Sequence, residues 1–596
     1  MSIAALFHRW RDYWQSAWGA ARIPDGLRHR FDEAAEEGTR VQKTTRRQVV
    51  SLELSAFQAV DVVRTTSDRQ VRHSPRLAAL VPKGGKYGFD LIAHVGTRVF
   101  LQGTALQAVA AELRPRAVPF SSLHDLLMKF LYYFGHLHQQ YAAPLLRRWF
   151  QQRGGMTWLM DATVEPGTPA YFGLLEAESR VCLGAWKIAT ENADDLVPCL
   201  RQATLWFGAP HEVLHDLGDA MACACDTAWG ETVPHRVCHF HLLRDMGEDL
   251  YARPEAALRE LVRKLKLQTR LKEQRHVQTR WLREHVEDTT ALVQLLREQA
   301  ADVSTDVLGR EVALAFHQWI LDYASDGRRQ GYPFDPYLLY LHRRAARASA
   351  ELERLLAGPA ARLRPSRVLD SLSRMLRDYL HDARVAAAAA EFEQAAELFT
   401  RLRTAMRLSN EGTSPLHDPY LLESGEAREV QQSLEALREE CREKAKDPTD
   451  SQAATACRIV VEHLDRYATV LFRSDSRQRT TNSLEGHWGK AKRCCRKRHG
   501  RKKLTRDFQC LPPDVMLIPN LENPQYVEQV LGDLSRLPAK LAEAARSAPP
   551  WTRWRSQQKP VPTGRLPQRL LRQHNLIDKL VATYDNHCQP ESKRAA

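Results

Sequence analysis

Three short apolar segments place the tightest limits on how this chain folds. They are Thr157–Met160, Tyr171–Leu175 and Val181–Trp186, and residues that favour turns separate them. Short apolar runs bounded by proline, glycine and serine are typical of neighbouring strands joined by turns. We therefore expect a three-stranded hairpin or meander here, opened by a strand over Met156–Asp161.

A helix and further strands are predicted to follow. Apolar residues recur every three or four positions across Ala193–Phe207, which is the spacing of one helix face. Pro198 fits that helix only if it stands in the first turn. The later elements are a strand over Glu212–His215, a helix over Ala220–Trp229 and a strand over Arg236–Phe240. The order βββ-α-β-α-β predicts an α/β fold in which helices cover a mixed sheet.

Two carboxylates stand at the ends of predicted strands. Asp161 closes the first strand and Asp216 follows the fourth. If these two strands are neighbours, both side chains reach the same edge of the sheet. Two carboxylates repel each other, so the pair requires a hard cation or a shared proton, and a third acid would complete a two-metal phosphodiester site. Asp219 is an alternative second acid, but Asp216 directly ends the strand.

Glu485 is the candidate third acid. It lies one turn into a helix that Thr480 or Thr481 is expected to cap. Asn482 stands near it, in a position to orient Glu485 or to contact a phosphate. A glutamate here also has a structural explanation, because carboxylates are favoured at helix N-termini.

A dense run of cations follows Glu485. Its members are Lys490, Lys492, Arg493, Arg496, Lys497, Arg498, Arg501, Lys502, Lys503 and Arg506. A run of one sign repels itself and is stabilised by phosphates, so we expect salt-dependent binding to a nucleic-acid backbone. A nuclear-localisation signal is the alternative interpretation of such a run.

The composition bears on partner and compartment. The chain has 86 Lys and Arg against 72 Asp and Glu, a formal net charge of +14. That balance suits a polyanion, although a merely basic protein has it too. The 11 cysteines are scattered, the N-terminus lacks a signal-peptide core, and no window approaches the roughly 18 apolar residues of a membrane span. We expect a soluble cytoplasmic protein with reduced thiols, associated with the nucleoid if the host is bacterial.

The segment before the strands predicts three helices. The first covers Phe89–Phe100, Thr104 caps the second, and Ser121 or Ser122 caps a long third helix after Pro119. This spacing predicts a helix-turn-helix unit, and an ordinary three-helix bundle is the alternative. The side chains expected near a DNA groove are Ser121, Ser122, His124 and Lys129.

The remaining segments complete the expected organisation. Gln48–Leu54 and Ala59–Val63 alternate like a small hairpin, and the chain turns irregular and rich in proline from Pro512. From Pro254 to about Phe472 the pattern is helical without a sustained heptad, which predicts antiparallel helices rather than a coiled coil. The expected parts are a basic region (1–85), a helix-turn-helix domain (86–153), a core (154–253 and 473–520) interrupted by a helical insertion (254–472), and a C-terminal tail (521–596).

Taken together, these motifs resemble a known family. Asp161 in WLMDAT, Asp216 in VLHDLGDAM and Glu485 in RTTNSLEGHW resemble the acidic triad of DDE transposases with a ribonuclease-H-like core. Cys238 and His241 in VCHFHLLRDMG resemble the Cys-x-x-His signature of the bacterial insertion-sequence and Mutator-like branch. The helical stretch before Glu485 looks like the insertion of that branch, and KYGFDLIAHVGTRVFLQGTALQAVAAEL is similar to the helix-turn-helix that precedes its catalytic core.

The resemblance implies a DNA strand transferase. Asp161, Asp216 and Glu485 would hold two Mg²⁺ ions, for which Mn²⁺ substitutes, and would cut transposon ends and join them to target DNA. The implied partner is double-stranded DNA, and pairing two ends implies at least a homodimer. Two rival functions remain: a domesticated DNA-binding regulator that does not cut, and a structure-specific nuclease on the same core.

A zinc site is the alternative role for Cys238 and His241. It would need Cys223 and Cys225 as further ligands. Those two cysteines lie two residues apart on a predicted helix and therefore face apart, which makes them poor partners for one ion. We expect instead that Cys238 and His241 pack in the protein or help to position DNA.

Overall fold

The computed structural model describes residues 27–33, 38–165, 167–285, 305–357, 367–408, 421–423, 425–447, 451–471, 477–500, 502–557 and 574–588. The chain divides into two compact units. The first comprises Met1–Arg236 and Thr481–Ala596, and the second is Val237–Thr480. The expected mixed α/β class is confirmed, since the first unit contains two sheets and many helices.

The central sheet of the first unit has five strands in the order β7-β6-β5-β8-β9. β5 pairs antiparallel with β6, and β6 with β7, whereas β5 and β8 are parallel. The predicted meander and mixed sheet are therefore confirmed. The strands are β5 (Thr157–Thr163), β6 (Ala170–Glu176), β7 (Cys182–Ile188), β8 (Glu212–His215) and β9 (His235–Val237).

The end of the last strand differs from the prediction. β9 ends at Val237, and helix α9 (His239–Lys264) begins after Cys238, so the expected strand over Arg236–Phe240 is wrong beyond Val237. The apolar run that suggested a longer strand continues as the buried side of α9, since Leu242, Leu243 and Met246 are buried. A short apolar run cannot by itself separate a strand from a buried helix.

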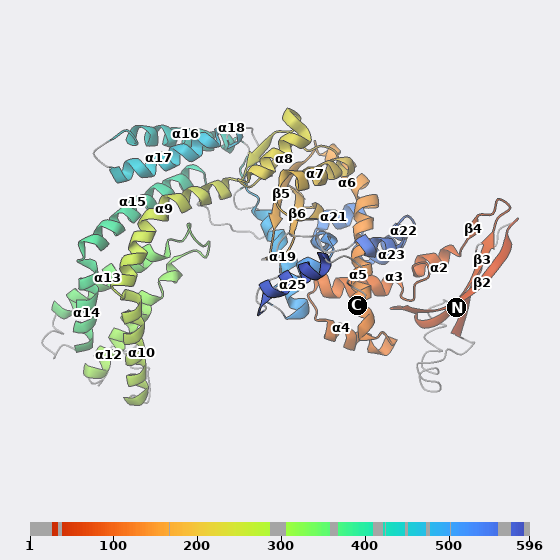
Figure 1. Cartoon of the computed structure of the whole chain (residues 1–596), viewed down its shortest axis with the longest axis horizontal. Coiled ribbons are helices and arrows are strands. Elements are labelled where there is room, and N and C mark those ends of the chain that lie inside the picture. The colour runs from red at the N-terminus through yellow and green to blue at the C-terminus, as the bar shows by residue number, and fades with distance from the viewer. Residues whose placement is uncertain are drawn as a thin grey trace. The chain divides into compact units, whose positions relative to one another are not determined.

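Helices cover both faces of the sheet. On one face lie α7 (Ala193–Phe207) and α8 (Asp219–Trp229), with the ring of Trp158 on β5 centred 5.7 Å from that of Trp229 (Figure 1). On the other face lies α20 (Thr505–Cys510), where Phe508 meets Tyr171 of β6 edge-to-face at 4.6 Å. Trp158 and Tyr171 face opposite sides of the sheet, because side chains alternate along a strand. A helix therefore packs on each face.

Helix α7 has the predicted bounds, and its ends explain why. The side chain of Asn192 accepts a hydrogen bond from the backbone N–H of Asp195, and Gly208 follows the last residue with φ of 94°. A capping side chain before the first turn is an ordinary start signal of a helix, and a glycine after the last residue is an ordinary stop signal. The expectation for Pro198 is wrong: it stands in the second turn, where it is exposed and water can reach the carbonyl that loses its partner.

The three predicted helices before the sheet are confirmed, but not their caps. They are α3 (Phe89–Gly96, continued by η2, Thr97–Leu101), α4 (Leu106–Leu113) and α5 (Phe120–Leu137). α4 starts after Ala105 and α5 after Pro119, and neither has a side-chain cap, so Thr104, Ser121 and Ser122 are not the capping residues.

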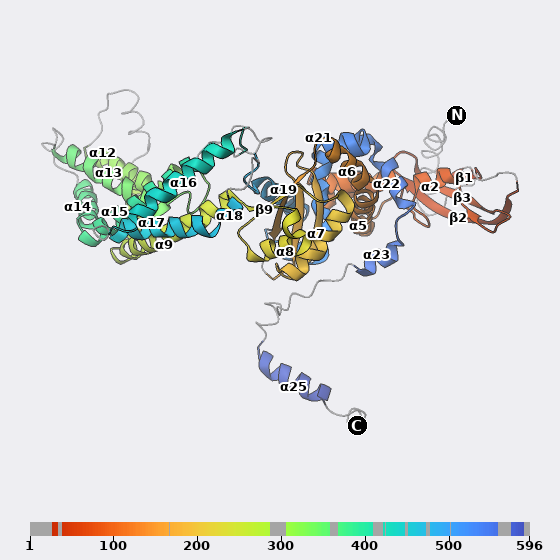
Figure 2. The same ribbon diagram turned by 90° about the horizontal axis from the view of Figure 1, so that it is seen from above.

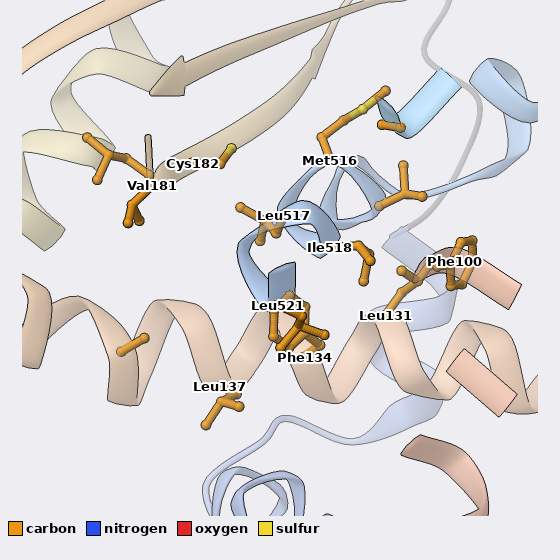
Figure 3. Packing of buried hydrophobic residues seen from close by; sticks show 14 of the residues in the cluster. Phe100, Leu131, Phe134, Leu137, Val181, Cys182, Met516, Leu517, Ile518 and Leu521 are labelled. Carbon is orange, nitrogen blue, oxygen red and sulfur yellow. The ribbon is translucent and has the colours of Figure 1, made fainter. Parts of the chain in front are cut away.

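The expected C-terminal tail is wrong where the chain beyond 520 packs into the core, whereas the stretch up to 520 is expected in the core and packs there. η8 (Pro513–Glu522) and α22 (Leu537–Ala545) pack into the main core of the first unit, and Figure 3 shows Met516, Leu517, Ile518 and Leu521 among side chains of α5 and β7. Asn520 pairs with edge strand β7: its Oδ1 accepts from the Cys182 N–H and its Nδ2 donates to the Cys182 carbonyl, both at 2.8 Å. α23 (Trp551–Gln557) follows and packs on α5.

The N-terminal region contains a second sheet, so the predicted hairpin is confirmed and is longer than expected. Strand order is β1-β3-β2, with β4 pairing the end of β3 (Figure 1). The elements are β1 (Arg28–Phe31), β2 (Arg40–Ser51), β3 (Ser55–Thr65), β4 (Val71–Arg72) and helix α2 (Pro75–Leu80). The described part of the predicted basic segment, 27–33 and 38–85, thus contains a folded sheet with a core of its own.

The second unit confirms the predicted helical insertion. Its described residues from His239 to Leu471 form helices and the loops between them, and α16 and α17 run side by side in both views (Figures 1 and 2). α9 continues through Pro254, so the unit begins earlier than the expected boundary. The other helices are α10 (Leu267–His285), α12 (Thr305–Leu321), α13 (Tyr337–Ala357), α14 (Arg367–Leu380), α15 (Ala383–Ala405), α16 (Glu426–Lys444), α17 (Ser451–Arg466) and α18 (Ala468–Leu471).

None of the helices in the described ranges is both long enough and apolar enough to cross a membrane.

Candidate functional site

The parallel pair β5 and β8 brings Asp161 and Asp216 to one level of the sheet. Leu159 is the register partner of Leu214. Asp161 and Asp216 each lie two residues further along, Asp161 inside β5 and Asp216 directly after β8. Adjacent strands lie about 4.8 Å apart. The first and fourth strands are therefore neighbours, which is the condition under which the two side chains reach the same edge of the sheet.

The backbone around both aspartates fixes their carboxylates. Oδ1 of Asp161 accepts a hydrogen bond from the N–H of Ala162 at 2.8 Å, and Oδ1 of Asp216 accepts one from the N–H of Gly218 at 2.9 Å. Both residues are partly buried. Each hydrogen bond therefore fixes the orientation of one carboxylate oxygen.

Glu191 is an acid beside Asp216 that the sequence reasoning missed. A Cβ added to Gly218 would lie 3.0 Å from Oδ1 of Asp216 and 3.7 Å from Oε1 of Glu191, so the two carboxyl groups flank the same small space. Packing around the Glu191 carboxyl, and then the charge of Asp216, raise the pKa of Glu191 even though the residue is exposed. Its place in the sequence, after a predicted strand and before a predicted helix, does not by itself bring it near Asp216.

Asp219, the alternative second acid, has a structural role. It is the first residue of α8 and is exposed. A carboxylate in the first turn interacts favourably with the positive end of the helix dipole. Asp216 lies level with Asp161, two residues beyond the Leu159–Leu214 pair, whereas Asp219 already belongs to α8.

Helix α19 (Asn482–His499) carries Glu485 and is seated against the sheet by Trp488. A Cβ added to Gly173 would come within 2.2 Å of the Trp488 ring. Gly173 is the register partner of Asp161, and directly paired residues of antiparallel strands point to the same face. Asp161 therefore lies on the face of the sheet that α19 covers.

Glu485 lies on the flank of α19 that is directed toward Asp161. Burial lowers the pKa of Lys492, and the carboxylates of Glu165 and, more weakly, Asp161 oppose that shift, so the Lys492 ammonium is within electrostatic reach of Asp161. Glu485 precedes Lys492 by two helical turns, which puts both on one side of the helix. Glu485 itself is exposed.

The described residues contain no arrangement of three or more His, Cys, Asp or Glu side chains that could hold a metal ion. The donor set nevertheless fits Mg²⁺ in kind, since it consists of carboxylate oxygens. Two side-chain atoms at the start of α19, Oδ1 of Asn482 and Oγ of Ser483, are buried without a hydrogen-bond partner. Buried polar atoms without partners are rare and need an explanation, and a group bound at this helix end would supply one.

The predicted run of cations separates into exposed and buried members. Lys490, Arg493 and Lys497 are exposed and fall on one stripe of α19, opposite its buried side. Lys502 and Lys503 are exposed just beyond the helix. Arg501 lies outside the described residues.

Three cations of the run lie beside acids of the protein, and one of them is Lys490, 3.6 Å from the Glu522 carboxylate. Lys492 and Arg496 lie 3.9 and 3.6 Å from the Glu165 carboxylate. The run is therefore neutralised in part by the protein itself, for Lys492 and Arg496 on the same flank that carries Glu485.

Arg498 corrects the expectation that the whole run contacts DNA. It is buried, pairs with the equally buried Asp507, and its guanidinium lies 5.7 Å from the centre of the Phe100 ring. A buried guanidinium bound to a carboxylate cannot at the same time neutralise a phosphate on the surface. The spacing of Arg498 puts it on the inner side of the helix end.

The predicted groove-contacting residues on α5 lie in different surroundings. Ser121 and His124 are exposed near its start, and Ser122 accepts a hydrogen bond from a tyrosine hydroxyl at 2.7 Å. Lys129 pairs with Asp125 at 2.7 Å. From Leu123 onward most of α5 is core. The surface for a groove is therefore confined to the first turns, and DNA contact by these residues stays a prediction.

Cys238 and His241 lie at the start of α9 in the second unit. Cys238 occupies the position before the first helical residue and is buried, and His241 is partly buried. Between them, the N–H of His239 donates to the carbonyl of Arg479 at 2.9 Å. The two segments where the chain passes between units are thus hydrogen-bonded to each other.

The cysteines proposed for the zinc alternative face apart as expected. Cys223 is exposed, while Cys225 is buried with its Sγ 4.0 Å from Sδ of Met160.

Comparison with protein-family models and with curated proteins found no match.

Proposed function

We propose that this protein is a DNA transposase, which cuts the ends of its element and joins them to target DNA by a DDE mechanism. The observation that carries the proposal is the in-register parallel pairing of β5 and β8, which sets Asp161 and Asp216 on adjacent strands at one level. The mixed sheet with helices on both faces is compatible with a ribonuclease-H-like core.

Three acids near this edge of the sheet are proposed to bind the catalytic metal. Asp161 and Asp216 provide carboxylates held by backbone N–H groups. Glu485 provides a third on the flank of α19 that is directed toward Asp161. With Mg²⁺ or Mn²⁺ bound by these three acids, the metal would activate the attacking water or 3′-hydroxyl and stabilise the departing 3′-oxygen.

The stripe of exposed cations on α19 binds the phosphates of the DNA substrate. Lys490, Arg493 and Lys497 are on the same helix as Glu485, so a DNA backbone bound to the stripe runs along the helix that carries the third acid. Each neutralised phosphate adds about 0.9 to the salt slope of binding. Two element ends must be joined in one event, so the active form contains at least two copies, acting on DNA in the cytoplasm or nucleoid.

The rival functions make different demands on the same site. A regulator that does not cut needs the basic stripe but not the acids, whereas a nuclease needs the acids but no joining. The test is a cutting and joining assay on duplexes tiled across the DNA that flanks the coding sequence, with Mg²⁺ or Mn²⁺. We expect wild type to cut and join, and Asp161→Asn, Asp216→Asn and Glu485→Gln to bind the same duplexes without doing either.

Asp219→Asn is the matched control, because Asp219 is an exposed carboxylate three residues from Asp216. It should cut and join like wild type. Cutting without joining would identify a nuclease, and specific binding without cutting in either metal would identify a regulator. Full activity of the Asp161, Asp216 or Glu485 variant would overturn the proposed site.

A further inference from the structure

The N-terminal sheet carries arginines on one of its faces. In β1, Arg28 and Arg30 pair with Gln58 and Val60 of β3, so the four residues share a face. Val60 is also the partner of Arg46 on β2, on its other side. One row of the sheet therefore reads Arg30, Val60, Arg46.

The same face continues at the end of the hairpin. Arg64 follows Val60 by four residues on β3 and pairs with Arg72 of β4. Thr44 and Gln48 of β2 are on the same face, because their register partners on β3 are Val62 and Gln58. We call this the arginine face, and it consists of Arg28, Arg30, Thr44, Arg46, Gln48, Gln58, Arg64 and Arg72.

The opposite face is the core of this region. Phe31, Phe57 and Ala59 alternate with the arginine-face residues and are buried together with Leu77 of α2. The arginine face is turned away from that core. Six of its members are exposed, namely Arg28, Arg30, Thr44, Arg46, Gln48 and Arg72.

Acids of the same region compensate part of the charge on this face. Asp32 pairs with Arg64 at 2.8 Å and with Arg30 at 3.2 Å, and those two bonds, that of Arg64 first, lower its pKa. Asp32 is therefore shared by two arginines of the face, and Arg72 interacts electrostatically with Asp68. Arg64 and Arg72 are direct cross-strand partners, and like charges in that position destabilise a sheet. A polyanion would remove this repulsion.

We propose that the arginine face is a second DNA-binding surface that holds the backbone of duplex DNA. Arginine forks bind phosphate oxygens in a bidentate manner, and threonine and glutamine donate to phosphate as well. The arginines come from three strands of this sheet, β1, β2 and β4, together with Arg64 of β3, so they spread over a surface rather than along one strand. The surface requires no cutting, so it stands whether the acids of the central sheet are catalytic or not.

The test measures the salt dependence of full-length protein binding to an arbitrary 30-base-pair duplex, by fluorescence anisotropy. The test variant changes four exposed arginines to glutamine; they are Arg28, Arg30, Arg46 and Arg72. Arg64 is kept because it holds Asp32. If each arginine neutralises one phosphate, the slope of log affinity against log salt falls by up to about 3.6. We expect a decrease of at least about 2 and at least a tenfold loss of affinity near 0.1 M salt.

The control variant removes the same charge from exposed cations of the region that lie off the arginine face. They are Arg40, Lys43, Arg76 and Lys83, each changed to glutamine. This variant should keep most of the wild-type slope. Four Arg→Lys changes on the arginine face should restore the slope, which also checks that the test variant is folded. Equal losses in test and control variants would overturn the proposal, as would unchanged DNA binding with lost binding to vesicles containing phosphatidylserine.

Discussion

The ring of Trp488 occupies the space above Gly173 where any other residue would carry its side chain: a Cβ built there would lie 2.2 Å from a ring carbon. Gly173 is the register partner of Asp161. The helix that carries Glu485 is therefore seated beside the strand that carries Asp161, through a contact that leaves no room for a methyl group.

Gly173→Ala should displace α19 and destabilise the first unit. Overpacking of a tight core costs about 1–3 kcal/mol, and the shift would also move Glu485 relative to Asp161. The free energy of unfolding from urea denaturation measures the first effect. Gly486→Ala is the matched control on the same helix, because a Cβ there meets no atom within 4 Å. It should be neutral or stabilise by up to about 1 kcal/mol. A Gly173→Ala protein as stable as wild type would show that the contact is not tight.

Arg498 and Arg493 should respond in opposite ways to the same substitution. Arg498→Ala leaves Asp507 buried without its partner, which costs about 3–5 kcal/mol. Arg493→Ala removes an exposed charge and should change stability by less than about 0.5 kcal/mol, while lowering the salt slope of DNA binding by about 0.9. Urea denaturation and anisotropy titrations on both variants decide this. A stable Arg498→Ala protein with a reduced salt slope would return Arg498 to the DNA-binding surface.

The part of the fold predictable from sequence is the part with a regular period. α7 was found with its bounds because Asn192 and Gly208 mark its ends. The chain from Pro512 is expected to be irregular, and its part beyond 520 to be a tail, because short 3-10 and π turns with prolines have no period to detect. Its place in the core depends on apolar residues that are only meaningful beside α5 and β7.

The candidate site divides in the same way. The strands beside Asp161 and Asp216 were predictable from apolar runs, and Asp216 does follow β8, but β5 continues two residues beyond Asp161. Whether a cation of the run is exposed depends on which side of α19 packs against the core. For this reason Arg493 is exposed and Arg498 is buried. Glu191 was missed because its proximity to Asp216 arises from the folded loop around Gly218.

Asn520 should be essential to the edge of the central sheet. Its amide satisfies both the N–H and the carbonyl of Cys182, as a neighbouring strand would. Asn520→Leu leaves two buried backbone groups without partners, each costing about 1–3 kcal/mol. Hydrogen exchange measured by mass spectrometry should show faster exchange in β7. Unchanged protection of β7, in a variant of wild-type stability, would contradict this role.

His138 should make the protein less stable in acid. Burial lowers its pKa to about 4, against the opposing effect of its hydrogen bond to the Leu183 carbonyl. The unfolded chain, with the ordinary pKa near 6.5, binds more protons between these values, so stability falls as pH drops from 6.5 to 4, by about 3 kcal/mol at most. His138→Gln removes this titration. Its urea unfolding free energy should change less than that of wild type across this range, and parallel profiles would refute the assignment.

Asp514 should have the opposite pH dependence. Its carboxyl packs against Gly135 of α5, and removal from water raises its pKa to about 7. The folded state then binds more protons than the unfolded chain between the ordinary aspartate pKa near 3.8 and about 7, so the contribution of Asp514 to stability is lost as pH rises through this window. The loss is at most about 4 kcal/mol, and less where water reaches this partly exposed residue.

Asp514→Asn keeps the shape and removes the charge. It should therefore stabilise the protein above pH 7 and have little effect below pH 4, as measured by urea denaturation at both ends of the range. Asp533→Asn is a control from the same segment, because the Asp533 carboxylate accepts a hydrogen bond from the N–H of Ser535 and its pKa is lowered. That change should destabilise at neutral pH, since it replaces a favoured anion. If Asp514→Asn also destabilises at neutral pH, the Asp514 carboxyl is ionised in the folded protein and its pKa is not raised.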